Sequence, residues 1–222
     1  MRIELRGVSK GRQGQSLSST TVGFESGRAT LTRAETEQRP TVLGLLASGR
    51  MRPDTGTVVI DGRADASGIR RRVALVDAPD VCDPAPNVTV AGVAAEELMF
   101  AGIPSNPLAV ARWLVDLGLA EFARVPIADV EPRVRLHLLT ELAILRDGVE
   151  GLVLVSPDRH GGDPLEWWAL ARDLADRGFA VLVIAGDASA AAIGAASMIA
   201  RMQADDADGL DAEAALAEGG LA

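Results

Sequence analysis

The stretch LVLVSPDRHGGDPLEWWALARDLADRGFAVLVI at Leu152–Ile184 decides the fold. It begins and ends with uninterrupted apolar runs, Leu152–Val155 and Ala180–Ile184, and helical periodicity occupies Leu165–Asp176 between them. An apolar run without alternation is typical of a strand that is covered on both faces, as strands of parallel sheets are. Because two such strands joined by a helix form a βαβ unit, the sequence predicts an α/β fold with a parallel sheet.

The chain before this unit changes character once. Short apolar or alternating patterns predict strands at Arg2–Val8, Ser16–Glu25, Ala29–Thr32, Thr57–Ile60 and Arg72–Val76. Helices are predicted at Thr41–Leu46, after Pro40, and then at Val90–Ala101, Leu108–Leu117 and Arg133–Leu145. We therefore expect a single domain with an α/β core at residues 1–83 and 146–203 and a helical subdomain at residues 84–145. A helix at Ala188–Ala195, a last strand at Ser197–Met202 and an acidic tail at residues 204–222 complete the prediction.

Composition excludes several classes of function. The 222 residues carry 22 Lys+Arg against 31 Asp+Glu, a net charge of −9, whereas contact with nucleic-acid phosphates needs clustered basic residues. The single cysteine, Cys82, excludes a disulfide framework, and two histidines, His137 and His160, leave little for a His-based metal centre. No apolar segment reaches the ~18 residues of a membrane span and no apolar leader is present. We expect a cytoplasmic protein without direct membrane insertion.

Five blocks, in order, resemble the nucleotide-binding domain of ABC transporters. IELRGVSKGRQGQSLSSTTVGFESGRATL at Ile3–Leu31 resembles its opening strands, and PTVLGLLASGRMRPDTGTVVIDG at Pro40–Gly62 resembles the helix and strand after its phosphate loop. RRRVALVDAP at Arg70–Pro79 resembles the strand before its glutamine loop, and NVTVAGVAAEELMFAGIP at Asn87–Pro104 the start of its helical subdomain. GLVLVSPDRHGGDP at Gly151–Pro164 resembles the strand before its catalytic acids and the D-loop. The resemblance implies a P-loop NTPase-like core of parallel sheet, an antiparallel β subdomain and an inserted helical subdomain.

The segment at the phosphate-loop position departs from the family. That loop needs glycines, whose backbone N–H groups converge on phosphate, and a lysine. This chain has no glycine there, and Glu35 and Glu37 fall where a triphosphate would lie, where like charges ~4 Å apart repel by roughly 1–4 kcal/mol. Arg39 stands at the lysine position, while Lys10, the only lysine, lies in the opening strand. The vestigial positions are Arg33, Glu35, Glu37, Gln38, Arg39, Thr41 and Pro40, which replaces a magnesium-binding serine and has no N–H.

The other positions of the resemblance have also lost their chemistry. Ser156 and Pro157 replace the two acids that hold Mg²⁺ and polarise the attacking water, and Asp158 is the nearest acid. Glu131–Arg135 aligns with the signature loop but contains neither glycine nor serine. The glutamine, switch-histidine and D-loop aspartate positions hold Ala78, Gly186 and Asp163. We expect no catalytic residue, metal or cofactor, with ATP and Mg²⁺ binding only if residual family activity survives.

The resemblance leads to three hypotheses. The first is a degenerate ABC transporter ATP-binding subunit, a pseudo-ATPase with a structural or regulatory role, paired with an active homologous subunit. It would attach to the inner face of the membrane through a permease, which would contact a groove near Asp77–Pro104. The alternative is a soluble scaffold or regulatory protein that reuses the fold. The second alternative is a subunit that binds ATP weakly through Arg39 and the helix dipole at Pro40.

Several residues could serve either structure or function. His137 is expected on a helix surface and Cys82 to be an inert thiol. His160 is expected to pack in a loop, with a metal site shared with Asp158 and Asp163 as the alternative. The run at Arg70–Arg72 is expected to be a solvated entry into a strand. Of the adjacent tryptophans one ring should lie in the core and one at the surface, and the candidate interface residues are Trp167, Trp168, Val81, Cys82 and Val90.

Overall fold

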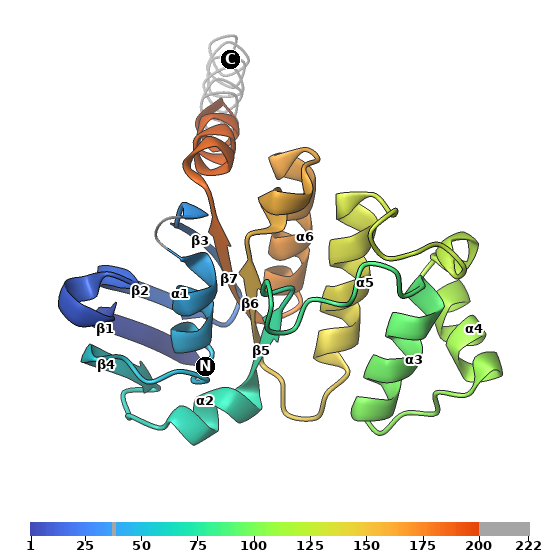
Figure 1. The fold of residues 1–222 in the computed structure, drawn as a ribbon, viewed down its shortest axis with the longest axis horizontal. Helices are drawn as coiled ribbons and strands as arrows, with labels where there is room; N and C mark the ends of the chain where they lie inside the picture. The colour runs from blue at the N-terminus through green and yellow to red at the C-terminus, as the bar shows by residue number, and fades with distance from the viewer. Residues whose placement is uncertain (37–38, 200–222) are drawn as a thin grey trace, which may run out of the picture.

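A four-stranded parallel sheet forms the centre of the computed structural model, which describes residues 1–36 and 39–199 (Figure 1). The strand order is β3-β7-β6-β5, made of β3 (Arg28–Arg33), β7 (Ala180–Ala185), β6 (Gly151–Val155) and β5 (Val73–Val76). Every residue of β5, β6 and β7 is buried. Helices cover both faces, which is why these strands are continuously apolar.

Two separate hydrophobic clusters flank this sheet. Leu152 and Leu154 of β6 point into one cluster, whereas Val153 and Val155 point into the other. This alternation follows from the two-residue period of a strand. The first cluster joins the sheet to α6 (Pro164–Asp176) and the helical block, and the second joins it to α1 (Pro40–Ala47) and the antiparallel sheet.

The antiparallel sheet has the order β2-β1-β4, with β1 (Arg2–Lys10) in the middle. Its neighbours are β2 (Leu17–Glu25) and β4 (Thr55–Ile60). Ile3 of β1 lies opposite Phe24 on one side and Ile60 on the other, and all three side chains are buried. Helix α1 (Pro40–Ala47) lies between the two sheets and contacts β1, β6 and β7.

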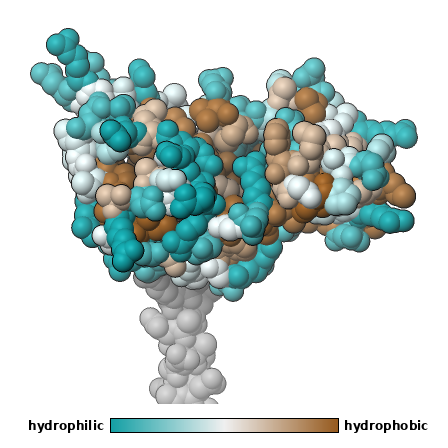
Figure 2. Space-filling view, turned by 90° about the horizontal axis from the view of Figure 1, so that it is seen from below, coloured by the Kyte–Doolittle hydropathy of each residue, from teal (hydrophilic) through white to brown (hydrophobic). Residues whose placement is uncertain are grey.

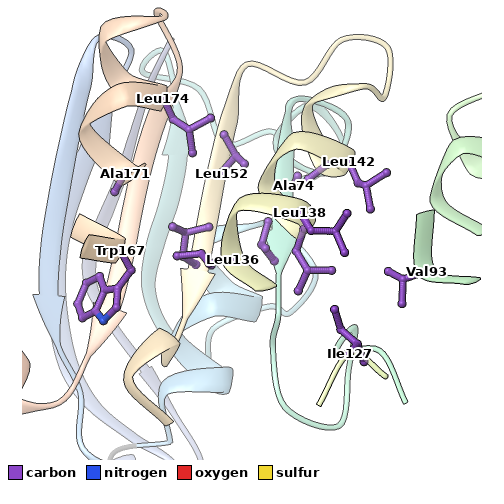
Figure 3. Close-up of a cluster of buried hydrophobic side chains, with 14 of the residues drawn as sticks. Ala74, Val93, Ile127, Leu136, Leu138, Leu142, Leu152, Trp167, Ala171 and Leu174 are labelled. Carbon is purple, nitrogen blue, oxygen red and sulfur yellow. The ribbon is translucent and has the colours of Figure 1, made fainter. Parts of the chain in front are cut away.

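The helical block contains α3 (Val90–Phe100), α4 (Pro107–Asp116), the 3₁₀ turn η3 (Ala120–Phe122) and α5 (Pro132–Ile144). Helix α5 packs against β5 and α6, and α3 packs against α5. The buried side chains between them include Leu136, Leu138 and Leu142 of α5 together with Leu152 of β6 (Figure 3). A continuous apolar core therefore joins the block to the sheet.

The structure corrects two predictions. Residues Ala66–Arg72 form a helix, α2, so Arg70–Arg72 are its last turn and lead directly into β5 at Val73. Asp65 caps α2 by accepting a hydrogen bond from the Gly68 amide at 2.8 Å. The strand expected at Ser197–Met202 is wrong, because residues 187–199 form one helix, and residues 200–202 lie outside the described part of the chain. The predicted acidic tail at 204–222 also lies outside it.

The remaining short elements are the 3₁₀ turns η1 (Arg12–Gly14) and η4 (Pro157–His160). Within residues 1–36 and 39–199, no helix combines the length and the apolar character that crossing a membrane requires.

Candidate functional site

A cavity of about 650 Å³ lies at the carboxyl ends of β3, β6 and β7, beside the start of α1. In open parallel sheets this edge is where ligands bind, because loops from successive strands meet there. Six of the residues assigned to the vestigial nucleotide site line it: Glu35, Arg39, Pro40, Thr41, Ser156 and Gly186. The structure therefore brings together segments that lie up to about 150 positions apart in the chain.

Two carboxylates in this cavity bond to the chain itself. Glu35 Oε1 accepts the backbone N–H of Asp187 at 2.6 Å. Asp158 Oδ2 accepts the backbone N–H of Gly186 at 2.8 Å, with the Ser189 hydroxyl at 3.4 Å. These amides stand at the beginning of the helix at residues 187–199, whose N-terminal dipole favours negative charge. Side chains of the protein thus take a position that would attract an anion.

Gly186 leaves room for both acids. A Cβ at this position would lie 3.1 Å from Asp158 Oδ2 and 3.1 Å from Glu35 Oε1. The side chain of a histidine, which the resemblance would place here, competes with the two carboxylates for the same space.

The start of α1 offers few free donors. Pro40 is its first residue and has no N–H, and the Val42 N–H bonds to the Arg39 carbonyl at 2.8 Å. Arg39 itself has a left-handed backbone (φ 48°) and an exposed side chain. The described residues of this segment, 33–36 and 39–41, therefore form no row of converging amides like the one that cradles phosphate in a glycine-rich loop.

Other assigned residues lie outside the cavity. Ala78 and Pro157 are buried, and Asp163 caps α6 by accepting the Leu165 amide at 2.8 Å. Arg33 is exposed on β3, with its Nε 3.9 Å from a carboxylate oxygen of Asp187. Two further assigned residues, Glu37 and Gln38, lie outside the described part of the chain.

The only lysine of the sequence, Lys10, bonds to residues that do not line this cavity. Lys10 Nζ donates to Asp54 Oδ1 at 2.7 Å and to the Arg52 carbonyl at 3.0 Å. It therefore ties the end of β1 to the turn before β4 and does not reach the start of α1.

A buried ionic cluster lies next to the cavity, and sequence reasoning missed it. Asp77, directly after β5, accepts hydrogen bonds from Arg135 Nε at 3.1 Å and Nη2 at 2.6 Å. Its two oxygens also bond to Arg159 Nη2 at 3.1 Å and His160 Nε2 at 2.9 Å. Arg159 additionally donates to the Asp77 carbonyl. An acid directly after a buried strand was the only local signal, because its partners lie on distant elements.

The cluster keeps Asp77 ionised. Burial on its own would raise the pKa of this carboxyl, but hydrogen bonds from His160 and Arg135 and the charges of Arg135 and Arg159 hold it well below its usual value. Arg135 falls in the segment that aligns with the signature loop, so this segment serves a structural contact between α5 and β5.

The metal alternative gains no support. His160 bonds to Asp77, Asp158 bonds to Gly186 and Asp163 caps a helix, so the three side chains serve different partners. Across residues 1–36 and 39–199, no group of three or more His, Cys, Asp or Glu side chains could hold a metal ion. His137 is half-buried on α5.

Of the candidate interface residues, Trp167 and Val90 lie in the hydrophobic core. Figure 3 shows the Trp167 ring among the buried side chains. Trp168 is half-buried and packs against the same cluster. Val81 and Cys82 are exposed in the loop after β5.

Comparison with known proteins finds similarity in structure and not in sequence. No protein-family model and no curated protein matches the sequence. A solved structure described as the ATP-binding subunit of an ABC transporter is 20% identical, with a TM-score of 0.55 over 84% of this chain and 80% of that one. A putative ABC transporter ATP-binding protein from Pyrococcus furiosus is 13% identical, with a TM-score of 0.60 over 84% and 92%. This chain therefore has the fold of ABC transporter ATP-binding subunits, as its sequence blocks predict.

Proposed function

We propose that this chain is a non-hydrolysing ATP-binding-type subunit of an ABC transport complex, with a structural or regulatory role. The observation that carries the proposal is the bonding of Glu35 and Asp158 to the amides of Asp187 and Gly186, inside the cavity where a triphosphate would lie. Two carboxylates there repel phosphate, and neither can move without leaving a helix N-terminus unpaired.

The chemistry around these acids supports the same conclusion. Ser156 and the buried Pro157 have no carboxylate that could bind Mg²⁺. Arg39 has a left-handed backbone and an exposed side chain. Electrostatic stabilisation of phosphoryl transfer needs a metal, a cradle of amides and a positioned water. Across residues 1–36 and 39–199 no group of three or more His, Cys, Asp or Glu side chains could hold a metal ion, and the described residues at the start of α1 form no cradle of amides.

Thermal melting with and without Mg-ATP tests the proposal directly. We expect no rise in Tm at millimolar Mg-ATP and no phosphate release. A ligand with a Kd below ~1 mM would add several tenths of a kcal/mol or more at millimolar concentration, which a melt detects. A saturable rise in Tm caused by binding in the cavity at Glu35, or ATP hydrolysis that the purified chain retains after repeated chromatography, would overturn the proposal.

The partners we propose are a permease and an active homologous ATP-binding subunit, with the chain on the cytoplasmic face of the membrane through the permease. A small cavity of about 170 Å³ between the core and the helical block supports this position. Val81, Cys82, Leu139 and Ala143 line it, with the arginines Arg50 and Arg146 and the acids Asp77 and Glu97 at its sides. Val81 is 47% exposed at its edge, as a contact residue must be.

Affinity purification from solubilised membranes tests these partners. We expect the tagged full chain to recover a permease and a second ATP-binding subunit, and Val81→Asp to reduce that recovery. Leu165→Asp is the matched control, because Leu165 is 40% exposed on α6 and does not line the small cavity. Recovery of soluble proteins alone would favour the scaffold alternative. Equal loss of recovery in both variants would contradict the assignment of the permease contact to the small cavity.

A further inference from the structure

A second large cavity, of about 610 Å³, lies at the opposite end of α1 from Glu35, between that end, β4 and α2. Its walls are mainly apolar, and three arginines line it: Arg50, Arg52 and Arg70. No acidic residue lines this arginine cavity, whereas three acids line the cavity at Glu35. In a chain with net charge −9, such a concentration of unopposed positive charge is unexpected.

Close approach of the turn after α1 to the start of α2 builds the arginine cavity. Gly49, directly after α1, has a left-handed backbone (φ 68°), and a Cβ there would lie 2.7 Å from the Ala66 carbonyl oxygen. Only glycine permits this approach. It places Arg50 and Arg70, which come from two different segments, at one cavity, above the buried side chain of Ile69.

Backbone carbonyls hold two of the arginines in place. Arg50 Nη1 donates to the carbonyls of Ser48 at 3.1 Å and Val73 at 3.0 Å. Arg70 Nη1 donates to the Gly49 carbonyl at 3.0 Å. Each guanidinium has five N–H donors, so these bonds orient the group and leave other donors available. The side chains are therefore positioned before any ligand arrives, which lowers the entropy cost of binding.

These arginines have no carboxylate partner. Their neighbour Arg72 pairs with Asp61 at 3.0 Å and Glu150 at 2.7 Å, but across residues 1–36 and 39–199 no ion pair involves Arg50, Arg52 or Arg70. Burial lowers the pKa of Arg50 from its usual value, and the positive charges of Arg146 and Arg70 lower it further against an opposing effect of Cys82. An anion placed between the guanidinium groups would relieve this repulsion.

We propose that the arginine cavity binds a small organic anion, with its phosphate or carboxylate group on Arg50 and Arg70 and its apolar body against Met51 and Val58. The guanidinium fork matches both oxyanions in bidentate geometry. The volume falls in the range of small-molecule sites, which combine apolar walls with a few positioned polar groups. The face that carries α2 is seen in Figure 2, where apolar surface is exposed between hydrophilic side chains.

Calorimetric titration of the full chain tests this site with four probes. Phenyl phosphate and phenylacetate carry an oxyanion on an apolar body, inorganic phosphate lacks the body, and benzylamine reverses the charge. We expect saturable binding of phenyl phosphate or phenylacetate that is stronger than binding of the other two. Arg70→Gln should weaken it about tenfold, because a charge-assisted hydrogen bond is lost. Arg50→Gln is a second variant with the same expected loss.

Arg112→Gln is the matched control, since Arg112 is exposed on α4 and does not line the arginine cavity. It should bind the probes as the unmodified chain does. The proposal is overturned if neither organic anion binds saturably, if inorganic phosphate or benzylamine binds equally well, or if Arg70→Gln and Arg112→Gln behave alike.

The arginine cavity is independent of the proposed function, and the two can be separated. A rise in Tm with Mg-ATP that persists in Arg70→Gln would count against the non-hydrolysing assignment alone. A rise that disappears in Arg70→Gln would place the nucleotide in the arginine cavity and support the anion site.

Discussion

Asp77 and Arg135 form a buried ion pair across 58 positions of the chain, with Oδ1 and Nη2 2.6 Å apart. Their side chains are 2% and 6% exposed. The pair joins the end of β5 to the first turn of α5, so it connects the sheet to the helical block. In its absence the apolar core would still hold the two parts together, but a charge would be left buried.

Replacement of Asp77 by Ala should therefore be strongly destabilising. Breaking a buried pair leaves the partner charge uncompensated, and we expect the free energy of unfolding to fall by about 3–5 kcal/mol. Urea denaturation measures this free energy of unfolding. Asp173→Ala is the control, because Asp173 is 67% exposed and its pair with Arg177 should contribute less than about 1 kcal/mol. Equal losses in the two variants would contradict the structural role of the cluster.

The lowered pKa of Asp77 predicts that its contribution to the free energy of unfolding is lost at low pH. The hydrogen bonds and charges around Asp77 hold its pKa below the usual value despite burial, which acts in the opposite direction. Its contribution is then fully present above the unfolded pKa of about 3.9 and is lost as the pH falls further toward the folded pKa. The difference in unfolding free energy between the unmodified chain and Asp77→Asn should shrink below about pH 4. A difference that stays constant down to pH 2 would contradict this.

Replacing Gly44 by alanine should destabilise the protein, although Gly44 lies within a helix. Alanine in a helix interior normally stabilises by roughly 0.5–1 kcal/mol relative to glycine. At this position a Cβ would lie 2.6 Å from Val155 Cγ2 and 3.2 Å from Leu75 Cδ1. We expect Gly44→Ala to lose about 1–2 kcal/mol by overpacking, read as a lower Tm. Gly194→Ala is the matched control, since no atom lies within 4 Å of its Cβ, and it should not lower Tm.

Placing a lysine at position 39 and a serine at position 40 should not produce nucleotide binding. The double variant Arg39→Lys/Pro40→Ser returns a compact ammonium and one N–H donor, but Glu35 and Asp158 stay in the cavity and no glycine is added. We expect its Tm to be independent of millimolar Mg-ATP. A saturable rise would show that two substitutions alone separate this chain from an ATP-binding one.

Cys82 should alkylate slowly in the folded protein. Although the residue as a whole is exposed, its Sγ lies at part-buried contacts with the Ala78 amide and the Leu75 carbonyl. Burial of the thiol raises its pKa, with a further rise from the Asp77 charge, although the Ala78 amide acts in the opposite direction. The Sγ also donates to the Leu75 carbonyl at 3.4 Å. The pH midpoint of reaction with iodoacetamide should lie above the ~8.5 of a free thiol. The urea-unfolded chain gives the reference, and a folded midpoint at or below it would contradict the prediction.

Much of the fold was predictable because the relevant signals are local. The continuous apolar runs at Leu152–Val155 and Ala180–Ile184 form adjacent parallel strands, as predicted. Helical periodicity correctly predicted the helix between them and, apart from α2, the helices that precede them in the chain. Helix α2 was missed because Ala66–Arg72 has no clear apolar face. It is held by one cap, at Asp65, and by the burial of Ile69.

The candidate site was predictable only in part. The sequence resemblance placed Glu35, Arg39, Pro40 and Gly186 together at one predicted site, and they do line one cavity. No pattern along the chain indicated that Glu35 would bond to the Asp187 amide, a partner 152 positions away.

The amino-acid order alone thus determined most of the succession of strands and helices, and the absence of glycine from residues 33–41, because both depend on residues close together in the chain. Only the tertiary structure decided that Asp77 meets Arg135, and that Arg50 and Arg70 share one cavity. Those contacts depend on how separate elements pack, and packing is set by the summed burial of side chains over the whole domain. The spacing of residues along the chain does not show which distant side chains will be buried together.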